Sequence, residues 1–546
     1  MKYNILKKIT LFAFLAISVL VSDSGCNKFQ NIGDGVKLII DYNLIKTTVD
    51  LQLVDASTNQ LVGFDGSVSV TTKITGDDKD GVIDITGVRN PNYEYKSQMG
   101  FVSLAILPEA AFLPSNENPI SFNVVVQHDG YLSTSQHIVI ASEGRNFVPI
   151  KMVKIDTPPN GVVVIVTPGA TTTDTEGRVE NPVIVETPAG RSQLEIPEGL
   201  IVLDSAGVPL QGNLNVTLVH FDNTEQEALE AFPGGLSGNV TRLDGSAEDG
   251  MFYSAGFVAI EISDDQGRKA ATFENGTLAL ISEINGDTYN PETQANVVAG
   301  DQVPLWSYDE YTGRWTEEDN LVIIGSNGTM QVLAQLTHLS YYNFDWFYGG
   351  QNCYTGSTFI FTADAPLCDC VMLSGVMYRQ SDNTFMKYVY MWVCGTDPVY
   401  TYYAPAGVPV YIVWDNNYSN FTVNPANNPT YITDLCSTDP VNIGLVVNNT
   451  STTIYINVEV YCPDNPDAII RPSFGAYFRP IDSYNWRWAE MVTGNAEICD
   501  VILGQTYVVG IYYDGEWYET EVLIDQTSYN YIGYEIPADV CAEIFP

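Results

Sequence analysis

Short runs of apolar and β-branched residues, separated by glycine, proline, asparagine and aspartate, recur along most of the chain. These runs lie at 38–42, 67–74, 122–127, 162–166, 214–219, 257–262, 388–393, 408–414, 453–460 and 507–512. Runs of this length bounded by turn residues predict β-strands. Only 225–231 has a helical composition. We therefore expect an all-β protein of tandem antiparallel, immunoglobulin-like β-sandwiches.

Proline and cysteine positions suggest where one domain ends and the next begins. The pair Pro158-Pro159 stiffens a linker and ends any strand before it. Sequence rich in cysteine and tyrosine begins near Tyr348. These features place a first sandwich at 26–157 and a second at 158–346.

The last two hundred residues contain an internal repeat. The segment Gly375–Arg379 resembles Gly475–Arg479, and Cys394 and Cys436 have the same separation as Cys499 and Cys541. Equal cysteine spacing, in the same order as the other matches, indicates two homologous β-domains. We place them at 347–440 and 441–546.

The N-terminal segment has the layout of a bacterial export signal. Lysines at its start are followed by an apolar stretch from Ile9 to Val21 and by a Gly25-Cys26 junction. The junction resembles a lipobox, which implies a signal peptide at 1–25 and a lipid on Cys26. Asp23 departs from the aliphatic residue of that pattern. Ordinary cleavage near Gly25 and an uncleaved anchor are the alternatives, and no later stretch is long and apolar enough to cross a bilayer.

The other eight cysteines all lie between Cys353 and Cys541, which predicts a disulfide framework formed in an oxidising compartment. The repeat suggests bridges Cys394–Cys436 and Cys499–Cys541. The remaining two bridges would then join Cys353, Cys368, Cys370 and Cys462. This connectivity is a hypothesis, because eight cysteines allow 105 pairings. Zinc is disfavoured, since Cys368 and Cys370 are too close for the usual ligand spacing and no histidine follows Cys353.

The charge of the chain is strongly negative, with 24 lysine and arginine residues against 66 aspartate and glutamate residues. A surface of this sign repels nucleic acid and anionic membranes, so we expect no nucleic-acid partner. Binding of divalent cations or of a cationic partner is one interpretation. We favour the other, a well-solvated exterior.

Three strings in the second domain, at 231–236, 303–315 and 336–345, carry a family resemblance. The middle string resembles the signature of the extracellular module in cartilage intermediate layer protein, and similar modules occur in lipoproteins of Bacteroidota bacteria. The first domain resembles the transthyretin-like, carboxypeptidase-regulatory-like sandwiches that precede such modules, and the C-terminal pair resembles domains found beside them. The resemblance implies an extracellular, non-catalytic β-sandwich protein with no catalytic residues to transfer.

The middle string also has a physical interpretation. Asp309 and Gly313 are turn residues, one as a side-chain acceptor and one as a residue free to adopt positive φ. Trp306 and Trp315 flank this turn and can pack together across a hairpin. We interpret His338, which follows in the third string, as a structural histidine.

Motifs of catalysis are scarce. The chain has four histidines and no zinc-protease, serine-hydrolase or P-loop signature. A glycosidase with dispersed carboxylates remains a weaker alternative. We therefore expect a protein that is not an enzyme.

Two features are candidates for binding. Asp77, Asp78, Asp80 and Asp84 resemble part of a calcium loop, although Lys79 lies among them and a solvated turn is the favoured interpretation. We expect no other cofactor. Five aromatic residues form the second feature and either bind a glycan or a protein, or belong to the core: Tyr402, Trp486, Trp488, Tyr513 and Trp517.

Together these features predict a lipoprotein anchored in the outer membrane, on the cell surface rather than the periplasmic face. We expect it to be a structural or protein-interaction subunit that associates with other envelope proteins. A glycan-binding or adhesive lipoprotein is the alternative. An exposed aromatic row would favour glycan, a broad apolar patch would favour assembly, and a deep acidic pocket would favour an enzyme.

Overall fold

The computed structural model describes residues 46–535, apart from 65, 67, 86, 327–328, 351, 365–370, 394–396, 417–420, 448–451, 464, 473, 482–486 and 514–515. Strands make up most of this part of the chain, so the expected all-β fold is confirmed. The short helix α2 (Gln226–Glu230) lies in the segment predicted to be helical. No helix among these residues has the length and apolar character needed to span a membrane.

The first sandwich, residues 47–152, has two four-stranded sheets. One has the order β3 (Val82–Asp84), β5 (Phe101–Ile106), β1 (Thr47–Asp55) and β8 (Gly144–Met152). The other has the order β4 (Glu94–Lys96), β2 (Thr71–Thr75), β6 (Ile120–Gln127) and β7 (Thr134–Ile140). Alternate residues point inward from each sheet, such as Leu51 of β1 and Val124 of β6, and form one buried core.

The second sandwich, residues 162–349, is the largest. Its seven-stranded sheet has the order β14 (Ser237–Thr241), β21 (Arg314–Val322), β20 (Gln302–Asp309), β24 (Tyr341–Gly349), β15 (Ala247–Asp264), β13 (Gly212–Phe221) and β9 (Val162–Thr173). The facing sheet has the order β10 (Val183–Glu186), β11 (Ser192–Ile196), β17 (Leu278–Ile284), β23 (Thr329–Leu336) and β22 (Ile324–Ser326). Two small ribbons join β12 (Ile201–Asp204) to β16 (Ala270–Glu274) and β18 (Tyr289–Asn290) to β19 (Ala295–Asn296).

The third sandwich, residues 352–447, again has two four-stranded sheets. One has the order β28 (Val399–Pro405), β25 (Asn352–Ala363), β32 (Val441–Val447) and β30 (Phe421–Val423). The other has the order β27 (Phe385–Val393), β26 (Val371–Arg379), β29 (Val410–Trp414) and β31 (Thr430–Ile432). Because β32 pairs with β25 and β30, this sandwich continues to Val447, beyond the boundary predicted after Pro440.

The fourth unit, residues 452–535, is one eight-stranded sheet around a shared core that includes Ile454, Phe478 and Tyr507. Its order is β34 (Asn465–Ile470), β33 (Thr452–Cys462), β37 (Asn495–Val501), β36 (Arg487–Val492), β35 (Phe474–Pro480), β38 (Thr506–Tyr513) and β39 (Glu516–Leu523), and β40 (Ser528–Glu535) pairs with β33.

Strand pairing in the third sandwich recurs in the fourth unit. Strand β25 pairs with β28 and lies parallel to β32, and β33 likewise pairs with β37 and lies parallel to β40. Strand β26 lies between β27 and β29, as β35 lies between β36 and β38. This common order accompanies the repeat in the sequence.

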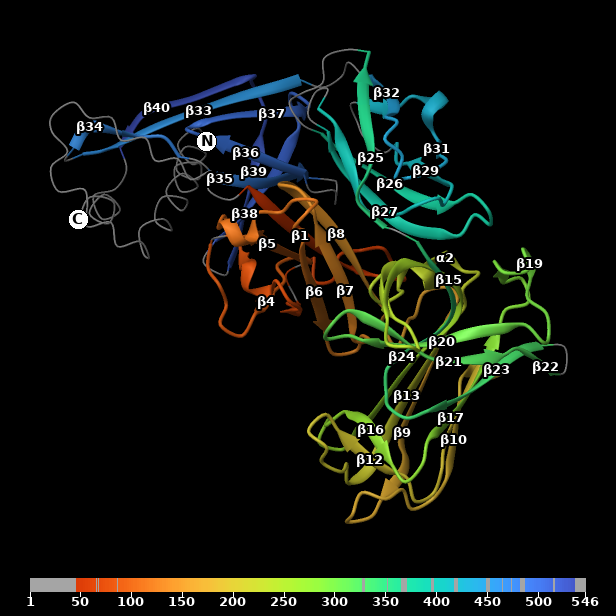
Figure 1. Ribbon diagram of the computed structural model, residues 1–546. Coiled ribbons are helices and arrows are strands. Elements are labelled where there is room, and N and C mark those ends of the chain that lie inside the picture. Colours follow the sequence, from red (N-terminus) through yellow and green to blue (C-terminus); the bar gives the residue numbers. More distant parts are fainter. Residues whose placement is uncertain are drawn as a thin grey trace.

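The first sandwich lies among the other three parts of the molecule (Figure 1). Ser135 Oγ and the Tyr308 hydroxyl of the second sandwich are 2.7 Å apart. The Phe147 ring stacks on Trp392 of the third, with centroids 6.3 Å apart. The Tyr477 hydroxyl of the fourth donates to Asp50. The N-terminal sandwich therefore contacts each of the other three parts of the described chain.

Candidate functional site

The five aromatic side chains predicted to bind a ligand all lie outside the described part of the structure. Trp486 lies outside the described residues, as do the side chains of Tyr402, Trp488, Tyr513 and Trp517. Backbone pairing places Tyr402 opposite Thr355 on β25. A binding role for the five stays a prediction.

The four carboxylates of the proposed calcium loop have separate partners. Asp78 Oδ2 accepts a hydrogen bond from Ser121 N at 2.7 Å, and Asp84 Oδ1 accepts one from Val88 N at 2.8 Å. Asp80 accepts a hydrogen bond from the Tyr93 hydroxyl, and Asp77 extends into solvent with Arg314 as its nearest cation at 3.7 Å. Within the described ranges, no group of three or more histidine, cysteine, aspartate or glutamate residues has the arrangement of a metal site. Calcium binding stays the disfavoured alternative to a solvated turn.

The predicted bridge Cys394–Cys436 is wrong, because Cys436 is bonded to Cys353. The two sulfurs meet where the start of β25 passes the segment after β31, and each lies 3.5 Å from the Ala404 carbonyl oxygen. The spacing of the cysteines along the chain did not predict that these two strand ends lie side by side. Cys462 and Cys499 are disulfide-bonded too. Residues Cys26, Cys368, Cys370, Cys394 and Cys541 lie outside the described part of the chain.

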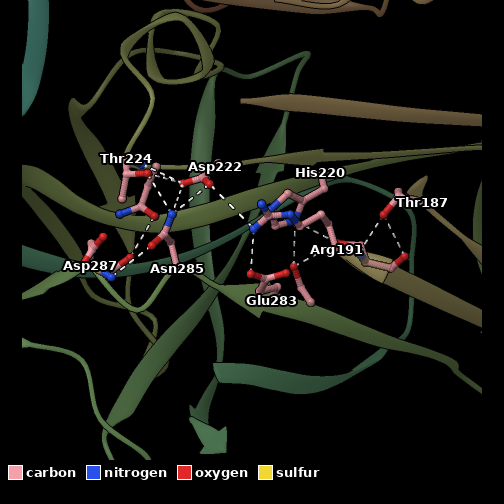
Figure 2. Close-up of polar contacts among 12 residues, drawn as sticks. Thr187, Arg191, His220, Asp222, Thr224, Glu283, Asn285 and Asp287 are labelled. Carbon is pink, nitrogen blue, oxygen red and sulfur yellow. Dashed lines mark hydrogen bonds and ion pairs between the residues drawn. The ribbon is translucent and has the colours of Figure 1, made fainter. Parts of the chain in front are cut away.

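A buried polar cluster joins the two sheets of the second sandwich, and Figure 2 shows its polar contacts in close-up. His220 of β13 reaches across to two serines of the facing sheet, with Nδ1 at 3.0 Å from Ser192 Oγ and 3.3 Å from Ser282 Oγ. Ser192 N also donates to Thr187 Oγ1 at 2.8 Å. No local motif in the sequence marks this cluster, because its members come from three distant strands.

Charged residues continue the cluster toward the surface. Asn285 Nδ2 donates to both carboxylate oxygens of Asp222, and the Arg191 guanidinium lies 2.7 Å from Glu283 (Figure 2). Burial opposes ionisation of Asp222, but hydrogen bonds from Thr224 and Asn285 outweigh it. The pKa of this carboxyl therefore lies below its usual value.

A serine beside a histidine and an aspartate suggests nucleophilic catalysis, but this geometry does not support it. His220 and both serine side chains are almost fully buried, so no substrate reaches the hydroxyls. Burial lowers the pKa of His220 to about 4, which keeps the imidazole neutral, and its Nδ1 is shared between the two serines. The cluster therefore acts as a polar tie between sheets.

The turn expected at Asp309–Gly313 is present. Asp309 Oδ1 accepts hydrogen bonds from Tyr311 N and Thr312 N, and Gly313 has a φ of 70°. The tryptophans pair differently from the prediction. The register that starts at the turn pairs Trp315 with Tyr308, with ring centroids 4.7 Å apart, and a bulge follows only beyond Trp306. Trp306 and Trp315 instead meet through a shared neighbour, Phe252.

This turn packs against the first sandwich. A Cβ on Gly313 would lie 2.9 Å from Asn123 Oδ1, so the close approach requires glycine as much as the turn does. Ser133 Oγ donates to Glu310 Oε2 at 3.1 Å. Burial, with a nearby carboxylate on Glu261, raises the pKa of Glu310 to about 7. The motif that carries the family resemblance is therefore a contact between sandwiches.

His338, interpreted as structural, is half-buried in the second sandwich. Its ring is 5.7 Å from that of Tyr342, and its backbone oxygen accepts a hydrogen bond from the Tyr342 hydroxyl. Nε2 lies 3.8 Å from Glu318 Oε1. These contacts are with neighbours in the same sandwich and leave the interpretation unchanged.

A row of tyrosines crosses one sheet of the third sandwich, from the contact with the second sandwich at Tyr378 to the exposed Tyr431. Tyr378, Tyr411 and Tyr431 occupy paired positions on β26, β29 and β31. Neighbouring ring centroids are 5.3 Å and 5.7 Å apart, and Tyr431 is 68% exposed. Sequence reasoning missed this row, because each strand contributes one tyrosine and only the register aligns them.

Comparison with known proteins identifies no family: no family model matches the chain, and no curated protein matches it. Among solved structures it is similar to the Bacillus anthracis TIE protein, with 10% identity over 69% of this chain and 58% of that one and a TM-score of 0.15. It is also similar to the RrgB pilus protein from Streptococcus pneumoniae, with 8% identity over 90% of this chain and 98% of that one and a TM-score of 0.13. A pilus-presented adhesin, Spy0125 (Cpa), matches at 8% identity over 74% of this chain and 99% of that one, with a TM-score of 0.15. TM-scores this low carry no argument about function.

Proposed function

We propose that this protein is a non-catalytic lipoprotein of the outer membrane, held at the cell surface by lipid on Cys26. In this proposal it is a structural subunit that binds other envelope proteins. The export-type leader supports the location, and the Cys353–Cys436 disulfide supports an oxidising compartment. The observation that carries the proposal is a buried contact shared by three sandwiches.

The contact centres on an ion pair. Lys151 of the first sandwich lies 3.0 Å from Glu230 on helix α2 of the second, and only 6% and 5% of these side chains are exposed. The Lys151 ammonium also lies 5.1 Å from the ring centroid of Tyr388 in the third sandwich. Desolvating an ion pair is costly, so such a pair persists only where the surroundings hold both charges in place. An arrangement fixed in this way suits a scaffold that presents several surfaces together.

Recovery of companions from the cell envelope tests this function. The tagged protein is purified from detergent-solubilised membranes of its own cells, and a Cys26→Ala variant is purified in parallel. We expect the native protein to carry an N-terminal lipid and to bring the same envelope proteins down at constant ratio. The variant should leave the membrane fraction. Purification of an unacylated protein without any companion would contradict the proposal.

The tyrosine row favours a second candidate, glycan binding. Tyrosine offers a flat apolar face and a polar edge, which suits the mixed character of a sugar ring. Tyr411 also keeps its hydroxyl engaged with Asn383 Oδ1 at 3.2 Å, which fixes the ring in place. Tyr431 is the exposed end of the row, whereas Tyr378 and Tyr411 are partly buried. The Tyr378 hydroxyl donates to Gln226 of the second sandwich. The exposed end has the character expected of a sugar-stacking surface.

Retention on insoluble polysaccharides tests the second candidate. The double variant Tyr411→Ala and Tyr431→Ala should lose retention that the parent protein shows. Tyr455→Ala is the matched control, because Tyr455 is 54% exposed on the fourth unit and lies outside the row. Equal retention of the double variant and the parent would remove the row from consideration.

A further inference from the structure

A cleft of about 460 Å³ lies between the first and third sandwiches. One wall comes from the third sandwich and includes Thr355 and Thr358 of β25, Tyr400 of β28 and the segment 436–438. The opposite wall comes from loops of the first sandwich and includes Asn116 and Ser142. Concave sites at domain junctions are common places for ligands.

The wall on β25 is shaped by a β-bulge. Pairing between β25 and β28 slips between Thr355 and Thr358, so Gly356 and Ser357 are left out of the ladder. A Cβ on Gly356 would lie 2.1 Å from Thr401 Oγ1 and 2.8 Å from the Thr401 carbonyl oxygen. Only glycine fits there. Bulges redirect side chains and are frequent beside binding sites.

The segment 436–438 is held firmly against that bulge. Cys436 is joined to Cys353 of β25, and Ser357 Oγ donates to the Leu435 carbonyl oxygen at 3.0 Å. Asp434 Oδ1 accepts hydrogen bonds from Gly407 N at 3.0 Å and Cys436 N at 2.9 Å. These contacts are all within the protein and fix the wall, so binding here costs little ordering of it.

The chemistry of the lining selects a class of ligand. The described residues that line the cleft include no charged side chain, although the chain has 66 acidic and 24 basic residues. They offer instead the hydroxyls of Ser437, Thr438 and the threonines of β25, and the Tyr400 ring, which is 37% exposed. An uncharged lining gives no ion-pair partner to an anion or a cation. Hydroxyl groups and an aromatic face match a neutral ligand with many hydroxyls and an apolar ring face.

We propose that this cleft binds a neutral oligosaccharide. One sugar ring stacks on Tyr400, and its hydroxyls exchange hydrogen bonds with Thr358 and Ser437. The inference rests on the glycan-binding candidate, but it places recognition of a short saccharide here rather than on the tyrosine row. A site formed by two sandwiches also ties saccharide binding to the junction between them.

The test uses the full mature chain and defined hexasaccharides. Maltohexaose, cellohexaose, xylohexaose and mannohexaose are the neutral probes, and hexagalacturonate is the acidic probe. We expect calorimetry to detect binding of at least one neutral probe and none of the acidic probe. Tyr400→Ala should weaken that binding by about tenfold, as expected for loss of a central aromatic contact. Ser437→Asp should abolish it, because the new carboxylate must lose water when the cleft is filled.

Tyr431→Ala is the control, since it removes an exposed tyrosine of the row and leaves the cleft intact. If Ser437→Asp melts early, Thr438→Asp replaces it, because Thr438 is more exposed. Saccharide binding that is lost in Tyr431→Ala but kept in Tyr400→Ala and in the aspartate variant would contradict binding in the cleft and support binding on the tyrosine row. Absence of binding to every neutral probe would overturn the cleft, and continued retention on polysaccharides would still support the row.

Discussion

His220 and Glu310 are buried in different parts of the molecule, and burial favours the neutral form of each. It lowers the pKa of His220 and raises the pKa of Glu310. His220 lies among serines inside the second sandwich, with Asp222 and Arg191 as the nearest charged groups acting on it. Glu310 lies at the junction with the first sandwich, where Ser133 donates to it and Glu261 adds negative charge. The sequence showed these residue types, but neither environment, because the surrounding groups come from distant strands.

Replacing His220 by asparagine should reduce the loss in free energy of unfolding that the parent protein shows as the pH falls. The folded pKa of about 4 lies below the unfolded value of 6.5, so the imidazole takes up a proton more readily after unfolding. Its contribution is therefore fully present above pH 6.5 and is lost as pH falls toward 4. The loss amounts to roughly 3 kcal/mol for a shift of this size. Urea denaturation between pH 4 and pH 8 measures it, and parallel curves for parent and variant would contradict the expectation. His137, whose pKa burial also lowers to about 4, acts in the same direction and remains in the variant.

Replacing Glu310 by glutamine should have the opposite dependence. The folded pKa of about 7 lies above the ordinary value of 4.5, so the unfolded chain ionises first as pH rises. The parent protein therefore loses stability between pH 4.5 and pH 7 and remains at the lower value above that range. We expect Glu310→Gln to be more stable than the parent by about 1–3 kcal/mol at pH 8 and nearly equal at pH 4.5. Thermal melting at the two values checks this, and a variant less stable at pH 8 would show that the junction needs the charge.

At the level of elements, alternation of apolar and polar residues predicted where strands form, and turn residues predicted where they end. The helix at 226–230 and the turn at Asp309 follow from local composition alone. The register between strands does not follow from local composition. A bulge such as that at Leu305–Trp306 depends on the residues against which each face of the strand packs. The cysteine pairing was missed for a similar reason, since sequence spacing does not say which strand ends meet.

Removing the Cys353–Cys436 bridge should destabilise the third sandwich. The bridge spans 83 residues, and cross-links that close loops of this size stabilise by about 2–5 kcal/mol. The double variant Cys353→Ser and Cys436→Ser should lower the denaturation midpoint accordingly. The single variant Cys353→Ser, which leaves a free thiol at Cys436, should lower the midpoint by the same amount. Non-reducing peptide mapping of the parent should find these two cysteines joined. A peptide linking Cys394 to Cys436 would contradict the pairing.

Calcium should leave the melting temperature unchanged. Asp78 and Asp84 are engaged by backbone amides, and Asp77 and Asp80 face other partners, so a cation gains no cluster of oxygens at this turn. Calorimetric melting in millimolar calcium and in chelator should coincide. A rise in melting temperature with calcium would show that the loop closes around the ion.

For the whole molecule, contacts between sandwiches could not be read from the chain. Lys151, Glu230 and Tyr388 lie far apart in sequence and form no motif, yet they meet where three sandwiches join. The predicted domain boundaries rested on prolines, cysteines and the repeat, which are local signals. The mutual placement depends on surface complementarity between units, which has no local signal.

Glu230→Gln should weaken this three-way junction strongly. Removing one charge leaves the Lys151 ammonium buried without its carboxylate, which typically costs about 3–5 kcal/mol. Glu143→Gln is the control, because Glu143 and Lys46 form an ion pair at 3.8 Å whose side chains are much more exposed, 44% and 62%. The control should change stability by under about 1 kcal/mol. Hydrogen exchange should rise on β8, α2 and β27 in Glu230→Gln alone, and equal effects of the two variants would show that burial of the pair adds nothing.

The parallel ladders that close three of the four parts bear on how the molecule responds to being pulled. In the first and third sandwiches and the fourth unit, the first described strand lies parallel to the last: β1 to β8, β25 to β32, and β33 to β40. Tension applied through the chain ends of such a unit draws the paired strands past each other, and all ladder hydrogen bonds share the load before any break. Antiparallel closing strands would peel apart one bond at a time. A chain tethered at its start and gripped by a partner near its end would therefore resist extension through a high unfolding barrier, the quantity that governs forced unfolding.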